Sequence, residues 1–132
     1  MTFLIAIARA AGFCGVLAII VLSLVPGPYR PHTGLPGPAE HFMAYCLTAS
    51  ALAFGFRPMA YRLVLTIGLA LLAGSMEIFQ RWVPGRHPAI TDAIVSCLGG
   101  LLGVALGSLL FDLATRAYKN RRGLGESPGA VL

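Results

Sequence analysis

Four apolar segments, separated by short polar connections, constrain the fold of this chain more than any other feature. They cover about 5–25, 40–56, 61–80 and 89–114, and an α-helix needs roughly 20 apolar residues to cross a bilayer core of about 30 Å. Because short connections make consecutive helices antiparallel neighbours, we predict an all-α polytopic membrane protein, a four-transmembrane-helix up-down bundle. One domain over 1–122 uses nearly all of the 132 residues, and we expect 123–132 to be a disordered cytoplasmic tail.

The composition agrees with a membrane protein. Only 11% of the residues are charged and 57% are hydrophobic, whereas soluble domains carry about 25% charged residues. The first segment ends in Leu24-Val25-Pro26-Gly27 rather than in a small-x-small cleavage sequence, so we expect it to be retained as a membrane helix. The three cysteines lie in apolar segments and form no CxxC pair, which argues against a disulfide framework or a zinc motif.

The basic residues alternate between the two sides of the predicted four-helix path. Arg30, Arg81 and Arg86 lie in the first and third connections. The others lie near the N-terminus, in the second connection and in the tail: Arg9, Arg57, Arg62, Arg116, Lys119, Arg121 and Arg122. The positive-inside rule therefore predicts that both termini are cytoplasmic and that the first and third connections face outside. The same distribution explains the net charge of +5 without a nucleic-acid partner.

A glycine stripe runs along the fourth segment. Gly99, Gly103 and Gly107 recur at four-residue spacing, and small residues at this period let membrane helices approach closely. We expect this stripe to pack within the chain, with Ala70 and Gly74 of the third segment as the partner surface. A homodimer face is the alternative.

The candidate site is a polar cluster at the outer level of the bundle. Ionisable groups at membrane depth are costly and persist mostly where they pair or act. Helical spacing places Glu77 and Gln80 on one face of the third helix and His41 and Tyr45 on one face of the second. Asp92 falls in the first turn of the fourth helix, where the helix dipole favours a carboxylate. The predicted cluster comprises His41, Tyr45, Glu77, Gln80, Arg86 and Asp92.

Several kinds of chemistry fit this cluster. Arg86 follows a glycine and flanks a helix start, which suits an anion such as a phosphate or a carboxylate. His41, Glu77 and Asp92 can bind a divalent metal or serve as an acid–base group. No HExxH, CxxC or nucleophile-elbow motif is present, so we assign no metal, no cofactor and no catalytic residue.

Structural roles for the same residues stay open. Arg86 can neutralise Asp92 or Glu77 and so tie the helices together, and His41 can be a hydrogen-bonded structural residue. Tyr45 and Trp82 fit interfacial anchors, because aromatic rings favour the headgroup zone.

The motifs of this cluster resemble the VanZ-like family of membrane proteins. The resemblance rests on His41-Phe42-x-x-Tyr45, then on Glu77-x-x-Gln80-x-x-x-Pro84-Gly85-Arg86, and on Asp92 followed by Gly99. It covers roughly 20–110 and implies a small protein of the bacterial inner membrane. A named member of that family is associated with low-level resistance to teicoplanin, a lipidated glycopeptide. The resemblance implies no settled biochemical mechanism.

The sequence features are compatible with three functions. The first is a non-enzymatic cell-envelope protein that binds a lipid headgroup or a lipid-linked cell-wall precursor through the outer polar cluster. The second is a membrane-embedded hydrolase that acts on lipid phosphates, with Glu77 or Asp92 as base and His41 as acid or metal ligand. The third is a small transporter subunit, which would need a dimer or larger assembly to enclose a path. Membrane lipids are the expected partners in the first two functions.

Overall fold

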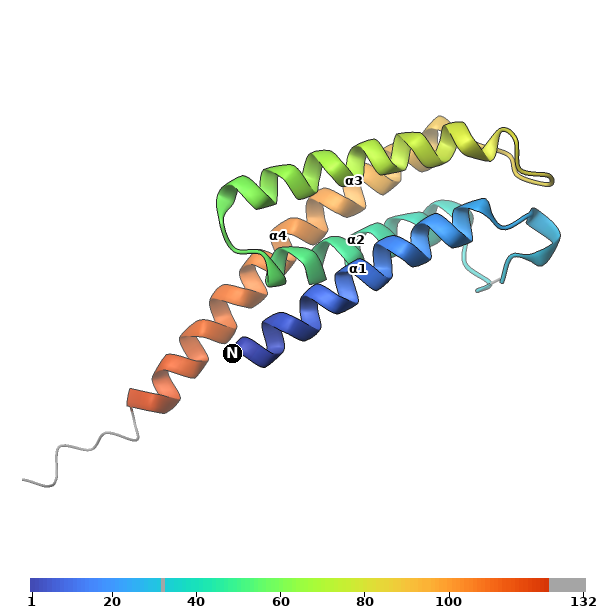
Figure 1. Ribbon diagram of the computed structural model, residues 1–132. Coiled ribbons are helices and arrows are strands. Elements are labelled where there is room, and N and C mark those ends of the chain that lie inside the picture. Colours follow the sequence, from blue (N-terminus) through green and yellow to red (C-terminus); the bar gives the residue numbers. More distant parts are fainter. Residues whose placement is uncertain (32, 124–132) are drawn as a thin grey trace, which may run out of the picture.

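The computed structural model describes residues 1–31 and 33–123, and within them every regular element is a helix. The helices are α1 (Thr2–Leu24), α2 (Gly37–Gly55), α3 (Met59–Gln80) and α4 (Ile90–Gly123), with a 3₁₀ turn at Gly27–Tyr29 (Figure 1). Figure 1 shows the connections α1–α2 and α3–α4 together at one end. The N-terminus and the α2–α3 turn lie at the other end. We call these the polar end and the basic end of the bundle.

Prolines set two of the helix starts. Pro36 and Pro58 are the N-cap residues of α2 and α3, both with extended backbone. Pro38 lies in the first turn of α2, where proline is tolerated because the helix needs no backbone donor there. For this reason α2 begins three residues before the predicted segment.

The helix α4 continues well past the predicted apolar segment. The hydrophobic run ends near 114, but the helix extends through polar residues to Gly123 and projects beyond the rest of the bundle (Figure 1). Hydrophobicity alone therefore placed its end too early, since helix propensity does not require apolar residues. The rest of the predicted tail, 124–132, lies outside the described residues.

The helices α2 and α4 form the centre of the bundle and run parallel to each other. The stripe Gly99, Gly103 and Gly107 lies directly against the backbone of α2 at Phe42, Cys46 and Ser50, respectively. Both sets advance by four residues, so the two backbones stay in contact over two helical turns. Glycine permits this close approach because a Cβ at any of the three positions would collide with an α2 carbonyl oxygen.

The partner surface predicted for the glycine stripe is therefore wrong, although packing within the chain is correct. A Cβ added at Gly74 would meet open space, so this face of α3 does not receive the stripe. The stripe packs on α2 instead, because the second helix, not the third, lies along the glycine face of α4.

The helices α1 and α3 flank the central pair. The helix α1 runs antiparallel to α2, since Gly12 lies against Leu52 and Gly15 against Thr48. Figure 1 shows α3 beside α4. A small core joins the layers and contains Ile19, Tyr45, Ala49, Leu69 and Ala73.

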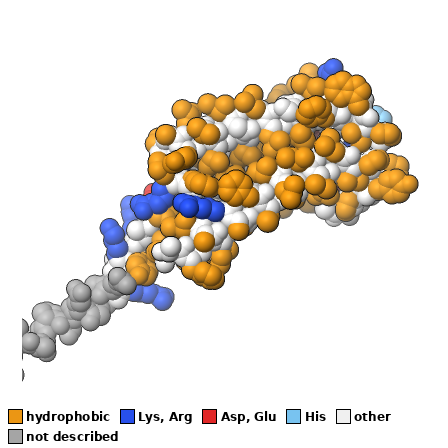
Figure 2. Space-filling view, in the orientation of Figure 1, with side chains coloured by type: hydrophobic (Ala, Val, Ile, Leu, Met, Phe, Trp, Pro, Cys, Tyr) orange, Lys and Arg blue, Asp and Glu red, His pale blue; other side chains and the backbone are white. Residues whose placement is uncertain are grey.

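Three of the four helices are long and apolar enough to cross a membrane: α1, α3 and the part of α4 from Ile90 to Arg121. The helix α2 does not meet that criterion, so the second predicted segment, 40–56, is not among these three. Large apolar side chains on the helix surfaces stay exposed, such as Leu17 at 61% and Leu71 at 66%. Orange hydrophobic groups cover most of the bundle in Figure 2. The chain is a small multi-pass membrane protein.

Basic side chains gather toward the basic end, as Figure 2 shows. The Arg9 Nε group donates a hydrogen bond to the Gly55 carbonyl, 2.9 Å away. The Arg57 guanidinium lies over the Phe111 ring, 4.4 Å from its centroid. These contacts hold the α2–α3 turn against α1 and α4.

Candidate functional site

The two connections at the polar end pack directly on each other. The backbone N–H of Gly27 donates to the Pro84 carbonyl, 3.0 Å away. Gly85 has a φ of 72°, a conformation that only glycine adopts readily. A Cβ at Gly27 would collide with the Gly85 carbonyl. The Pro84-Gly85 turn therefore fixes the end of α1 against the start of the α3–α4 connection.

This turn directs Arg86 at the C-terminus of α1. The Arg86 Nε group donates to the Val25 carbonyl at 3.0 Å, and its terminal Nη2 donates to the Leu22 carbonyl. The last carbonyls of a helix lack partners within the helix, so one guanidinium satisfies two groups at the end of α1. Among the described residues the ion pairs are Arg30–Glu40 and His41–Asp92. Arg86 forms no ion pair with Asp92 or Glu77 among them, so the alternative that it ties the helices through such a pair is not borne out.

A cavity of about 450 Å³ opens between α1 and α2 at the polar end. Along α1 it reaches from Ser23 to Gly15, a span of eight residues or about 12 Å. Most of its lining is apolar and includes Ile19, Leu22 and Leu47. Its mouth is polar and comprises Arg30, Thr33, Glu40, His41, Gln80 and Arg86.

The mouth contains an ion pair that the predicted site residues do not include. The Arg30 guanidinium bonds the Glu40 carboxylate, which also accepts the hydroxyl hydrogen of Thr33. These three residues fix the α1–α2 connection over the start of α2. A signal existed in the sequence, because Arg30 and Glu40 are the only charged residues of that connection and its helix start. Opposite charges at the two ends of a proline-rich loop favour such a pair.

The charged groups that line the mouth are two arginines and one glutamate, and Glu77 and Asp92 lie beside His41. Arg30 and Arg86 contribute two guanidiniums and Glu40 one carboxylate. Burial lowers the pKa of Arg86, and the neighbouring Arg30 lowers it further. Arginine still stays charged at neutral pH, so Arg30 and Arg86 can offer charged N–H donors to an anion at the mouth.

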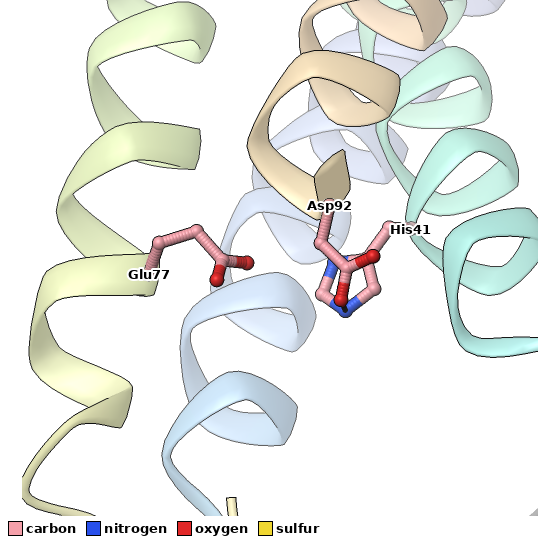
Figure 3. A group of neighbouring side chains, drawn as sticks. All are labelled: His41, Glu77 and Asp92. Atoms are coloured by element: carbon pink, nitrogen blue, oxygen red, sulfur yellow. Dashed lines mark ion pairs between the residues drawn. The ribbon is translucent and has the colours of Figure 1, made fainter. Parts of the chain in front are cut away.

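Beside the cavity, three helices bring His41, Glu77 and Asp92 together. Figure 3 shows the Glu77 carboxylate of α3 pointing toward Asp92 at the start of α4 and His41 on α2. One potential ligand atom from each residue lies within 4.8 Å of the other two. The His41 Nε2 and Asp92 Oδ2 atoms are 4.0 Å apart. The Glu77 Oε2 atom accepts the backbone N–H of Ala89 at 2.8 Å, which orients this carboxylate.

The structure thus gathers all six predicted residues at the polar end. His41, Tyr45, Gln80 and Arg86 line the cavity, and Glu77 and Asp92 meet His41 beside it. Gln80 is only 4% exposed, and its Nε2 atom has no hydrogen-bond partner. The interpretation of Tyr45 as an interfacial anchor is wrong, since its side chain is 2% exposed in the core. Trp82 is 73% exposed at the end of α3, so its anchoring role stays a prediction.

The chain shows no match to a protein-family model, to a curated protein or to a solved structure. The geometry of the polar end is therefore the basis for assigning a function.

Proposed function

We propose that this protein binds a phosphate-bearing lipid in the cavity between α1 and α2. The observation that carries this proposal is the division of the cavity into an apolar interior and a polar mouth that contains two arginines, Arg30 and Arg86. A phospholipid and a lipid-linked cell-wall precursor each have an apolar chain and an anionic phosphate group. The chain would enter the apolar interior, and the phosphate would stay at the mouth. Both ligands share this chemistry.

The dimensions support a ligand that enters chain first. A cavity of about 450 Å³ lies within the range of roughly 300–1,000 Å³ that is typical of small-molecule sites. Its depth of about 12 Å along α1 suits part of an acyl or prenyl chain. The remaining chain can continue into the bilayer, because the neighbouring surfaces of α1 and α2 expose Leu17 and Leu47.

The mouth supports recognition of a phosphate. Arg30 comes from the α1–α2 connection and Arg86 from the α3–α4 connection, and guanidinium groups bind phosphate oxygens with two parallel N–H donors. Two of the five Arg86 N–H donors engage the end of α1, and the other N–H groups can face a ligand. Arg30 exchanges part of its contact with Glu40 for the phosphate.

The proposed function also places the site relative to the membrane. We propose that α2 crosses the bilayer with the other three helices, since it packs along α1 and α4 over its whole length. The polar end then faces outside the bacterial inner membrane and both termini are cytoplasmic, as the basic end predicts. The resemblance to the VanZ-like family belongs to this proposal and fits an envelope protein.

Native mass spectrometry of the detergent-extracted protein tests this function. Purified chain is mixed with phosphatidylglycerol or a polyprenyl phosphate, and the retained lipid is measured for wild type, Arg30→Gln and Arg81→Gln. Arg81 is exposed at the end of α3 and does not line the cavity, so Arg81→Gln controls for net charge. A hydrogen bond to a charged group contributes about 1.5–3 kcal/mol, so Arg30→Gln should weaken retention roughly 10- to 100-fold.

A double variant separates lost phosphate contact from an unpaired Glu40. Arg30→Gln with Glu40→Gln removes both charges of the pair, and we expect the lipid to be lost from it as well. Equal retention by wild type and Arg30→Gln would contradict the proposal. Retention of uncharged diacylglycerol as strongly as phosphatidylglycerol would also contradict it, because the mouth would then recognise no phosphate.

A second function, hydrolysis of a lipid phosphate, is favoured by the convergence of His41, Glu77 and Asp92. In this reaction a water oxygen bonds to phosphorus, the ester or anhydride P–O bond breaks, and a carboxylate takes the proton from the water. Release of inorganic phosphate from a polyprenyl diphosphate, lost in Asp92→Asn, would support it. If the intact lipid binds stably and no phosphate is released, hydrolysis is excluded and the binding function stands by itself.

A further inference from the structure

We infer that His41, Glu77 and Asp92 form a binding site for one divalent transition-metal cation at the polar end of the bundle. This site lies next to the lipid cavity and does not depend on whether a lipid binds there. Each residue comes from a different helix, so a cation at this position would join α2, α3 and α4 at the polar end.

The distances fit a single ion after a small adjustment of side chains. Zinc binds histidine nitrogen and carboxylate oxygen at about 2.0–2.2 Å in a tetrahedral arrangement, so two ligand atoms of one ion lie roughly 3.4 Å apart. The His41 Nε2 and Asp92 Oδ2 atoms are 4.0 Å apart, and the ligand atoms of all three residues lie within 4.8 Å of one another, so a cation would draw the side chains together by about 1 Å. Glu77 is the longest of the three side chains and can close the difference.

The charges of the group call for a cation. Glu77 and Asp92 place two carboxylates near each other in half-buried positions. In the part of the chain that the structure describes, neither forms an ion pair with lysine or arginine. Two close carboxylates at the edge of a membrane repel each other unless a proton or a cation lies between them. The positive end of the α4 dipole offsets only part of this charge.

The hydrogen bond of Glu77 leaves one of its carboxylate oxygens free for a cation. The Ala89 N–H bonds to Glu77 Oε2, which orients this carboxylate and leaves its Oε1 atom for a cation. Such an outer contact is typical of metal-binding carboxylates and fixes the direction of the ligand. The donor set of one imidazole and two carboxylates suits Zn²⁺ or Mn²⁺.

Gln80 supplies an independent observation that points to a ligand. It lies one turn after Glu77 on α3 and lines the same cavity as His41. Its side chain is 96% buried, from its exposure of 4%, and Nε2 lacks an acceptor. A buried amide donor without a partner costs about 1–3 kcal/mol. A water or a phosphate oxygen bound to the cation would provide the missing acceptor.

The cavity gives the cation open coordination positions. Three protein ligands leave at least one position of a zinc or manganese ion for water or a ligand oxygen. His41 and Gln80 border the cavity, so this position opens toward it rather than toward packed side chains.

Isothermal titration calorimetry with Zn²⁺ tests the site. The chain is purified without a histidine tag, treated with a chelator and titrated as wild type, Glu77→Gln, Asp92→Asn and Asp112→Asn. Glu77→Gln keeps an oxygen acceptor for Ala89 N–H. Asp112 is exposed on α4 and outside the cluster, so Asp112→Asn is the matched control. We expect one Zn²⁺ per chain for wild type and the control, and at least tenfold weaker binding for the other two.

A measurement on the wild-type chain keeps the test valid if a variant unfolds. Electron spin echo spectroscopy with Mn²⁺ should detect hyperfine coupling to one imidazole nitrogen, which His41→Gln abolishes. Equal Zn²⁺ binding by wild type, Glu77→Gln and Asp92→Asn would overturn the inference. The absence of stoichiometric binding, or of nitrogen coupling in wild type, would overturn it as well.

Discussion

Gly27 lies against the carbonyl of Gly85, and the distance leaves no room for a side chain at residue 27. This contact joins two connections that are far apart in the sequence. It explains why both positions are glycine, since Gly85 also has a φ of 72°. The candidate site depends on this contact, because the same turn aims Arg86 at the end of α1.

We predict that Gly27→Ala destabilises the protein by about 1–3 kcal/mol, the usual cost of forcing extra volume into a packed contact. The added methyl group meets backbone rather than a flexible side chain, so the two connections must separate. Thermal unfolding in detergent, followed by intrinsic fluorescence, measures the change. The matched control is Gly37→Ala, because a Cβ at Gly37 would meet open space. A Gly27→Ala variant as stable as Gly37→Ala would refute the docking of the two connections.

Arg86 binds two carbonyls at the end of α1, and its substitution should therefore affect stability. We predict that Arg86→Lys lowers the free energy of unfolding by about 1–3 kcal/mol, because lysine cannot hold the Leu22 and Val25 carbonyls at once with a planar fork. Arg81→Lys should change it by less than about 0.5 kcal/mol, as is usual for an exposed position. Urea or thermal unfolding of both variants compares them. Similar values for the two would show that the α1 end does not need Arg86.

The sequence predicted much of the fold because apolar length and the short connections leave few arrangements for four helices. It also placed the six site residues at one level, since helical spacing fixes which side chains share a face. The choice of neighbours was not predictable in the same way. The glycine stripe fits any helix with a flat face, and only the packed structure shows that α2 receives it.

The contacts of individual side chains were the least predictable part of the site. Arg86 has several oxygen acceptors within reach of its flexible side chain, and carbonyls at a helix end leave no mark in the sequence. Tyr45 carries a hydroxyl that fits both an interface and a core, so its burial depends on the position of α2 at the centre of the bundle. The sequence shows Arg30 and Glu40 as opposite charges in one connection, but their contact follows from the shape of that connection.

The glycine stripe makes a prediction that distinguishes two glycines of similar sequence context. Gly103→Ala should destabilise the bundle by about 1–3 kcal/mol, because its Cβ would collide with the Cys46 carbonyl. Gly74→Ala should be neutral or stabilise α3 by up to about 1 kcal/mol, since alanine has the higher helix propensity and open space surrounds it. Thermal unfolding of both variants in the same detergent compares their stabilities with that of the wild type. Destabilisation by Gly74→Ala alone would place the stripe's partner on α3 after all.

The orientation of the bundle can be tested with single cysteines at its two ends. Tyr29 at the polar end and Met59 at the basic end are 80% and 77% exposed, so either position can react with a reagent from water. The native cysteines are first replaced. We then predict that Tyr29→Cys reacts with a membrane-impermeant maleimide in cells whose outer envelope is permeabilised and whose inner membrane is intact. Met59→Cys should react only after the inner membrane is disrupted, because the positive-inside rule places the basic end in the cytoplasm. Gel-shift labelling measures both reactions, and a permeant maleimide confirms that each thiol is reactive. The reverse pattern would place the polar end in the cytoplasm, and the lipid site would then face the inner leaflet rather than the outer one.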